Sequence, residues 1–186
     1  MAALRYFVMA SLDGFIADRT GNFDWAAPDE EVHGFVNDRM RDVGTYLYGR
    51  RMWDTMRYWQ TAPDSAGTEP VAADFARIWR AAEKIVYSAT LTELDSPHTR
   101  LRSRFDAGEV AELIASADAD LAVGGAGLAA YALRAGLVDE IEFLAVPVLV
   151  GGGTHWLPPD LRLDLELLDE HRFASGSVDL RYRVRR

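Results

Sequence analysis

The spacing of hydrophobic and polar residues predicts alternating strands and helices over the first two thirds of the chain. Short apolar runs typical of buried strands lie at residues 5–10, 45–48, 84–88 and 121–123. Between and after them, patterns typical of helices lie at residues 28–40, 73–82, 107–116 and 128–134. This alternation is typical of a mostly parallel sheet with helices on both faces.

The last third of the chain has a different pattern. Residues 140–150 form a long β-type run, and residues 161–167 and 178–184 alternate between apolar and polar side chains. The turn around Ser175-Gly176-Ser177 joins the last two segments into an antiparallel hairpin. We therefore predict an α/β fold whose mostly parallel central sheet carries this hairpin at its edge.

The composition is that of one globular domain. The chain has 186 residues, of which 49% are hydrophobic and 26% charged, so we expect a single domain over residues 1–186 with a surface loop at residues 61–70. It has no cysteine, no signal-peptide pattern and no apolar run close to the ~20 residues of a membrane span. We therefore expect a soluble, cytoplasmic protein.

Charge and missing motifs exclude several functions. The formal net charge of −9 argues against binding to nucleic acid or to an anionic membrane. The four histidines lack metal-ligand spacing, and the chain has neither a G-x-S-x-G nucleophile motif nor a G-x-x-x-x-G-K-[ST] phosphate loop. The sequence therefore predicts no metal site and neither serine-hydrolase nor P-loop chemistry.

Two glycine-containing turns that follow predicted strands are candidates for phosphate binding. Gly124-Gly125-Ala126-Gly127 leads into a helix, whose free N–H groups and dipole attract anions. Gly49-Arg50-Arg51 follows an earlier strand and offers two guanidinium groups. Each turn also has a simpler interpretation, tight packing for the glycines and solvation for the arginines, and the residues alone leave both open.

Taken together, six segments in this order resemble proteins of the dihydrofolate reductase-like family. They are Ser11-Leu12-Asp13-Gly14-Phe15-Ile16-Ala17, Tyr48-Gly49-Arg50-Arg51, Val86-Tyr87-Ser88-Ala89-Thr90-Leu91, Gly124-Gly125, and the segments 135–141 and 146–153. The last two are especially similar to the C-terminal reductase domain of the bifunctional deaminase–reductase of riboflavin biosynthesis. The resemblance covers nearly the whole chain and implies a stand-alone reductase domain with a three-layer fold.

This resemblance implies an NADPH-dependent oxidoreductase that transfers hydride to a small heterocyclic substrate, as 5-amino-6-(5-phosphoribosylamino)uracil reductase does. The implied cofactor-binding residues are Met9, Ala10, Ile16 and Ala17 for the nicotinamide, Gly49, Arg50, Arg51, Met52, Ser88 and Thr90 for the adenosine half, and Gly124, Gly125, Ala126, Gly127 and Leu128 for the pyrophosphate. Two positions depart from the family pattern, Met52 in place of a threonine and Ala89 in place of a frequent basic residue. The preference for NADPH then depends on Arg50 and Arg51, and NADH stays an alternative cofactor.

The substrate is less closely specified. Glu31, or its neighbour Glu30, lies nearest the position of the acid that holds the substrate in folate-reducing members, which makes Glu31 the candidate catalytic residue. Three other interpretations of the function are open. The first is a non-catalytic nucleotide- or metabolite-binding module, which Met52 and Ala89 favour; the others are a structural protein and a true dihydrofolate reductase. The apolar run 143–150 is either a central strand or a sheet edge that forms a homodimer, and its continuous apolar character favours the central strand.

Overall fold

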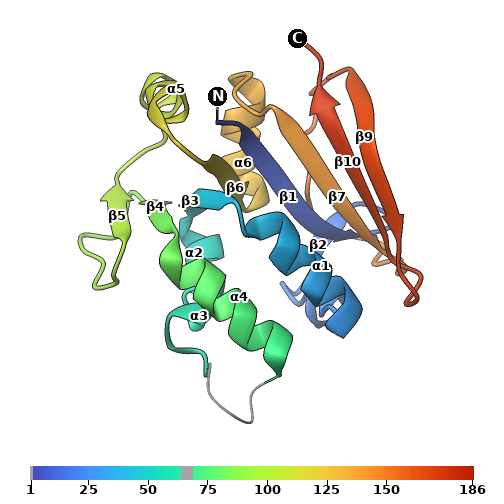
Figure 1. The fold of residues 1–186 in the computed structure, drawn as a ribbon. Helices are drawn as coiled ribbons and strands as arrows, with labels where there is room; N and C mark the ends of the chain where they lie inside the picture. Colours follow the sequence, from blue (N-terminus) through green and yellow to red (C-terminus); the bar gives the residue numbers. More distant parts are fainter. Residues whose placement is uncertain (1, 64–68) are drawn as a thin grey trace.

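The computed structural model describes residues 2–63 and 69–186. Its main sheet has eight strands: β1 Leu4–Ser11, β3 Val43–Gly49, β4 Glu83–Tyr87, β5 Thr99–Arg102, β6 Asp120–Gly124, β7 Glu140–Val146, β9 Leu165–Arg172 and β10 Val178–Val184. Their order across the sheet is β5-β4-β3-β6-β1-β7-β10-β9 (Figure 1), and the strands from β5 to β7 run parallel. Because β10 is antiparallel to both β7 and β9, the predicted hairpin at the sheet edge is confirmed.

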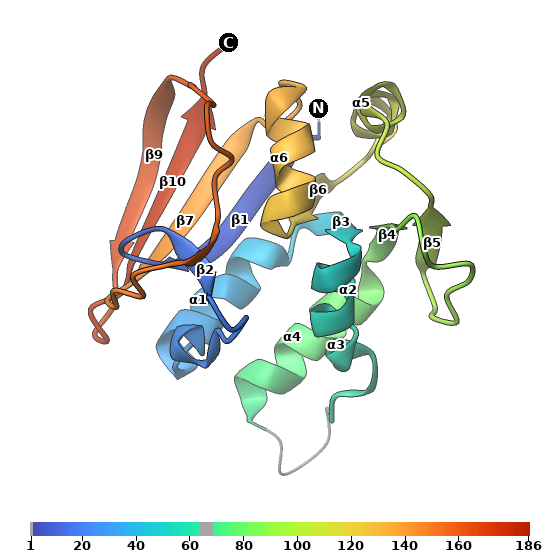
Figure 2. The same ribbon diagram turned by 180° about the vertical axis from the view of Figure 1, so that it is seen from behind.

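Helices cover both faces of this sheet and give three layers. Helices α1 (Glu30–Met40) and α4 (Pro70–Ala81) lie on the face toward the viewer in Figure 1, and α5 (Ala107–Ser116) and α6 (Ala126–Arg134) lie on the opposite face, seen in Figure 2. The short elements α2 (Arg50–Met56), α3 (Tyr58–Thr61) and η1 (Asp24–Ala26) lie beyond the strand ends. Within the described ranges, no helix has the length and apolarity needed to cross a bilayer.

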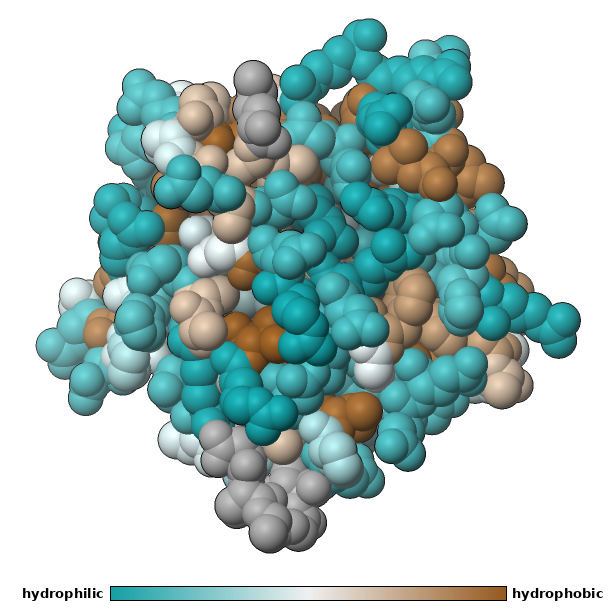
Figure 3. Space-filling view, in the orientation of Figure 1, coloured by the Kyte–Doolittle hydropathy of each residue, from teal (hydrophilic) through white to brown (hydrophobic). Residues whose placement is uncertain are grey.

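The surface seen from the side of α1 and α4 is largely hydrophilic, with small separate hydrophobic patches (Figure 3). Of the surface loop predicted at residues 61–70, positions 64–68 fall outside the described residues. Its flanks are described: α3 ends at Thr61, and α4 begins at Pro70, a residue suited to the first helical turn.

A second, two-stranded sheet pairs β2 (Phe15–Asp18) with β8 (Gly153–His155), two segments far apart in the sequence. Gly153 has a φ of +144°, and a methyl group there would lie 2.0 Å from the carbonyl oxygen of Ala17. Only glycine allows the two strands to approach this closely. The segment 146–153 of the sequence analysis therefore owes at least this glycine to packing.

Two predicted strands have wrong bounds. The run at residues 140–150 ends as a strand at Val146, because Pro147 has no N–H to continue the ladder. The strand predicted at residues 161–167 instead spans Leu165–Arg172, and Leu165 pairs with Val184. Residues before Leu165 still alternate, since Leu161 and Leu163 pack against the core on the α6 side of the sheet. Alternation therefore marks burial on one face here and does not mark ladder pairing.

Helix α2 was not predicted, because the segment Gly49-Arg50-Arg51 is typical of the end of a strand. The helix has only seven residues, too few to be stable by intrinsic propensity. Its Trp53 is buried and stacks on Trp79 of α4 with ring centroids 6.0 Å apart. Tertiary packing on a distant tryptophan therefore stabilises a helix that the local pattern does not indicate.

Beneath α1 the sheet buries a group of charged side chains. Arg5 of β1 donates from Nη2 to Glu142 Oε2 at 3.1 Å, and Arg39 of α1 places Nε 2.9 Å from Glu142 Oε1. Arg39 also bonds to Asp169 at the surface, and its Nη2 lies 3.9 Å from the fully buried Asp179. Burial and the charge of Glu142 together raise the pKa of Asp179 to about 7.

We expect Asp179→Asn to change how the free energy of unfolding depends on pH. Between the ordinary carboxyl pKa of about 4 and the raised folded value, the folded protein keeps a proton that the unfolded chain has lost. Wild-type stability therefore falls as pH rises through this interval. The variant should lack this slope and exceed the wild type at pH 8 by about 1 kcal/mol or more, measured by urea unfolding between pH 4 and 8.

Asp169→Asn is the matched control for this experiment. The hydrogen bond from Arg39 lowers the pKa of Asp169, so its contribution to stability is present above pH ~4 and is lost as pH falls. This variant should therefore gain no stability at pH 8. Identical pH slopes for the wild type and Asp179→Asn would contradict the role given to the buried carboxyl.

Candidate active site

The order of strands reverses direction between β6 and β1, and most of the candidate residues lie near this point. From β1 the chain moves to β3 on one side, whereas after β6 it crosses through α6 to β7 on the other side of β1. β1 pairs with β6 only at Leu4 and Arg5, and then continues alongside β7 as far as Ser11. In open α/β sheets, ligands bind outside the carboxyl ends of the strands at such a point.

The glycine turn after β6 packs closely against β3 and α2. Gly124 pairs with Tyr48, and a methyl group at Gly124 would lie 2.7 Å from Cε1 of that ring. Gly125 has a φ of +89°, and a methyl group there would lie 3.1 Å from Cβ of Met52. A methyl group at Gly127 would contact nothing within 4 Å. Packing thus requires the first two glycines, and the third faces open space.

The same turn leaves the start of α6 open to a ligand. Gly125 precedes the helix, and no side chain caps it, so the N–H groups of the first turn lack intrahelical partners. Helices α1 and α5, by contrast, are capped by the carboxylates of Asp29 and Asp106. An anion at the start of α6 would meet free N–H groups and the positive end of the helix dipole.

The arginine turn lies directly beside this helix start. A methyl group at Gly49 would lie 3.7 Å from Cβ of Leu128. Arg50 donates from Nε to Asp54 at 2.7 Å and lines a hollow of about 630 Å³ between α2, α3 and residues 91–96. Arg51 is exposed and forms no ion pair within the described part of the chain. Arg51 is therefore the guanidinium with the fewer competing contacts.

The other predicted cofactor residues fall into three places. Ser88 follows β4, the neighbour of β3, and its hydroxyl accepts from the N–H groups of Thr90 and Leu91, which holds this loop in shape. Met9 and Ala10 lie near the end of β1, with the Ala10 side chain fully buried. Ile16 and Ala17 lie on β2 of the small sheet. The structure thus brings together Gly49 to Met52 with Gly124 to Leu128 and places the remainder on adjoining strands and loops.

Asp13 ties the turn after β1 to the glycine-rich segment after β7. Its carboxylate accepts from the Ser11 hydroxyl at 2.6 Å and from the N–H groups of Val150 and Gly151 at 3.0 and 2.7 Å. These hydrogen bonds, that of Ser11 foremost, lower the pKa of Asp13 to about 2. Asp13 therefore stays ionised at neutral pH and serves as an anchor between two of the segments that carry the family resemblance.

A cavity of about 180 Å³ opens between β1, β7, α1 and the turn of the C-terminal hairpin. Its lining is mostly apolar and consists of Met9, Ala26, Ala27, Pro28, Asp29, Val32, Leu144, Val146, Pro147, Ser175 and Ser177. Met9 belongs both to this lining and to the predicted nicotinamide residues. The cavity therefore lies next to the β1 end of the candidate cofactor site and is the candidate substrate pocket.

Most of this lining was not predicted, because it joins segments from residue 9 to residue 177. Glu31, predicted from the resemblance to act on the substrate, is not among the lining residues: its Oε2 accepts from the N–H of Ala174 at 3.0 Å. Its role as a catalytic residue stays a prediction. The carboxylate that lines the cavity is that of Asp29. The sequence pattern that could have indicated Asp29 is an acidic residue directly before a helix, which is typical of a helix N-cap.

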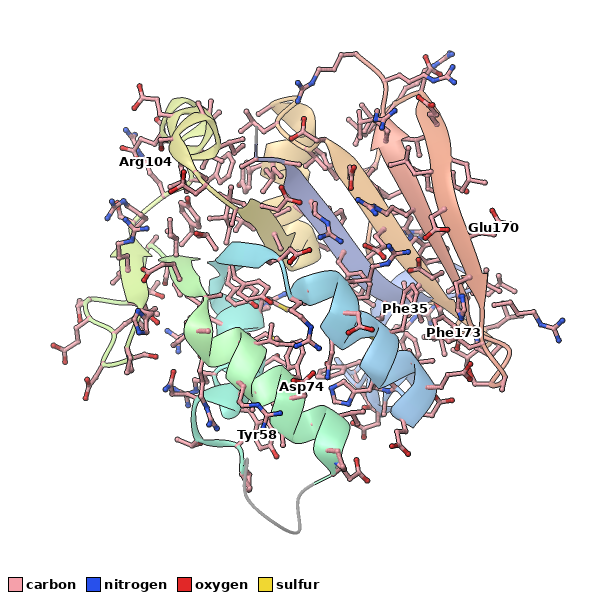
Figure 4. All side chains as sticks on the ribbon, in the orientation of Figure 1. Phe35, Tyr58, Asp74, Arg104, Glu170 and Phe173 are labelled. Atoms are coloured by element: carbon pink, nitrogen blue, oxygen red, sulfur yellow. The ribbon has the colours of Figure 1, made fainter. Side chains whose placement is uncertain are left out.

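The hairpin turn is held against α1 by two contacts. Phe35 of α1 meets Phe173 edge-on with ring centroids 5.1 Å apart, and Figure 4 shows the two side chains next to one another. Glu31 supplies the second contact through Ala174. Together they position Ser175 and Ser177 at the cavity.

Comparison with known sequences and folds supports the predicted fold. The family model of the RibD C-terminal domain matches residues 2–178. The uncharacterized protein YyaP of Bacillus subtilis (strain 168) is 29% identical over 174 residues, which cover 92% of this chain and 89% of YyaP. A crystal structure of a candidate riboflavin biosynthesis protein from Shewanella sp. PV-4 matches with a TM-score of 0.77 and 23% identity over 99% of both chains.

Two more distant structures show the same fold. One is a diaminohydroxyphosphoribosylaminopyrimidine deaminase/5-amino-6-(5-phosphoribosylamino)uracil reductase from Thermotoga maritima, with a TM-score of 0.66 and 15% identity over 98% of this chain and 56% of that protein. The other is dihydrofolate reductase from Enterococcus faecalis complexed with NADP(H), with a TM-score of 0.62 and 12% identity over 98% and 96% of the two chains. The predicted dihydrofolate reductase-like fold is confirmed.

We expect opposite effects from adding a methyl group at two glycines of the turn. Gly124→Ala forces the methyl group into the Tyr48 ring and should lower the free energy of unfolding by about 1–3 kcal/mol. Gly127→Ala meets open space inside a helix and should raise it by up to about 1 kcal/mol. Urea unfolding measures both, and equal effects would show that the turn is not packed as described.

Proposed function

Because the chain belongs to the RibD C-terminal domain family, we propose that it is an NADPH-dependent reductase that transfers hydride to a small heterocycle. The observation that carries the proposal is the uncapped start of α6 beside the arginine turn, at the point where the strand order reverses. A dinucleotide with two phosphate groups and a 2′-phosphate matches these two anion-attracting features.

The residues at this point fit such a cofactor. The N–H groups at the start of α6 would hold the pyrophosphate, where Gly127 leaves room for close approach. Arg51 and Arg50 would hold the 2′-phosphate, and the loop fixed by Ser88 would border the adenosine half. When bound, the nicotinamide supplies the hydride, and the protein supplies binding and orientation.

The cavity beside Met9 would hold the substrate. Its apolar walls, with Val32 and Leu144 both buried, exclude water from the space next to the nicotinamide-binding strand. The protein would then contribute mainly by placing the two reactants in contact, which is how an enzyme lowers the barrier of a transfer between bound molecules.

A titration of the purified protein with NADPH and, in parallel, with NADH tests the proposed function. Tryptophan quenching and calorimetry should both report micromolar NADPH binding, about −8 kcal/mol, and weaker NADH binding. Absence of binding by either cofactor would remove the proposed function. Binding without NADPH oxidation on any pterin or aminopyrimidine would support the non-catalytic module that Met52 and Ala89 favour.

Gly127→Asp should separate cofactor binding from stability. An aspartate in the first turn of α6 interacts well with the helix dipole and keeps the fold stable. Its charge would repel the pyrophosphate, so NADPH affinity should fall by about tenfold or more. Gly127→Asn, similar in size and neutral, is the control and should lose much less affinity; wild-type affinity in Gly127→Asp would contradict phosphate binding at this helix.

Arg51→Ala should weaken NADPH binding by about tenfold or more and NADH binding far less, because only NADPH carries the 2′-phosphate. Arg50→Ala is the comparison variant, with a smaller loss expected since Arg50 already pairs with Asp54. Calorimetry with both cofactors measures the difference. Equal losses for NADPH and NADH in Arg51→Ala would show that Arg51 does not read the 2′-phosphate.

A further inference from the structure

The candidate substrate pocket has an unusual charge for a phosphorylated substrate. Among the described residues that line it, Asp29 alone carries a formal charge, and that charge is negative. The remaining walls are apolar apart from the Ser175 and Ser177 hydroxyls. We propose that the pocket takes an amino-substituted heterocycle without a phosphate group, an inference that rests on the proposed function.

The arginines on the neighbouring elements α1 and β10 form ion pairs with acidic side chains. Arg39 contacts Glu142 and Asp169 beneath α1, and Arg181 donates two hydrogen bonds to Glu140. Each guanidinium is thus paired with acidic side chains outside the pocket lining and is not available to an incoming phosphate.

Arg19 and Arg172, on segments that adjoin the elements of the pocket, are not among its lining residues either. Arg19 donates to the carbonyl oxygen of Gly151 in the segment after β7. Arg172 precedes the hairpin turn, but its neighbour His171 stacks on Phe35 of α1, so Arg172 points to the opposite face of the sheet. A phosphate at the pocket would therefore meet the Asp29 carboxylate without a compensating cation.

The polar groups that remain suit N–H donors. Asp29 uses Oδ1 to cap α1 through the N–H of Val32 at 2.9 Å, which leaves Oδ2 to accept from a ligand. Ser177 accepts from Ser175 at 3.2 Å and can donate onward through its own hydroxyl. A carboxylate acceptor and a hydroxyl donor in the lining of one pocket match the amino and carbonyl groups on the edge of an aminopyrimidine.

This selectivity would distinguish the chain from the Thermotoga maritima structure, whose name specifies a phosphoribosyl substrate. The common fold leaves room for such a difference, because function depends on the residues of the site. In this chain those residues present a single negative charge to the substrate, and a dianionic phosphate is disfavoured near it.

The test compares 5-amino-6-ribosylaminouracil with its 5′-phosphate on the full chain loaded with NADPH. Calorimetry should show the unphosphorylated compound binding at least about tenfold more tightly. Equal or tighter binding of the phosphate, or binding of neither compound, would overturn the proposal. The prior NADPH titration separates the two failures: a chain that binds NADPH but prefers the phosphate loses only this inference.

Asp29→Asn examines the charge directly. Asparagine keeps the helix cap and removes the negative charge, so the preference for the unphosphorylated compound should shrink toward equal affinity. Asp106→Asn makes the same change at the start of α5, where Asp106 caps through Gly108 and Glu109, and should leave the preference unchanged. An undiminished preference in Asp29→Asn would show that Asp29 does not select the substrate.

Discussion

The contact between the backbone of Gly124 and the ring of Tyr48 determines where the candidate site forms. Tyr48 is fully enclosed and accepts a hydrogen bond from Nε1 of Trp79 at 3.2 Å, so its ring cannot move aside. Because Gly124 has no side chain, β6 approaches this ring closely. The ends of β3 and β6 then lie level, and α2 and α6 begin side by side. Both anion-attracting features depend on this one close approach.

The two halves of the site differ in charge, although the chain as a whole is acidic. The side at β3 and β6 offers Arg51 and the free N–H groups of α6. The side at β1 and β7 offers apolar walls with Asp29. Met9 lies between them on β1. This division fits the proposal of an anionic cofactor on one side and of a heterocycle without a phosphate group on the other.

Much of the fold could be predicted from the sequence because several elements bury one face at a regular period. The bounds predicted for the helix at residues 107–116 and the strand at residues 178–184 agree with α5 and β10. Elements that depend on distant partners were missed: α2 needs Trp79, and β2 needs β8. The two turns proposed to bind phosphate could be identified from the sequence because glycine and arginine mark them locally. The cavity could not be identified in this way, because it joins four separate segments. Its Asp29 was not among the predicted site residues, and the predicted Glu31 contacts Ala174 instead.

Amide hydrogen exchange at the start of α6, measured with and without saturating NADPH, tests the central claim most directly. The account predicts that the N–H groups of Ala126, Gly127 and Leu128 exchange more slowly when NADPH is present, because phosphate oxygens accept from them. The N–H groups of Gly108 and Glu109, already capped by Asp106 at the start of α5, should be unaffected. Unchanged exchange at residues 126–128 with NADPH bound elsewhere would contradict the account.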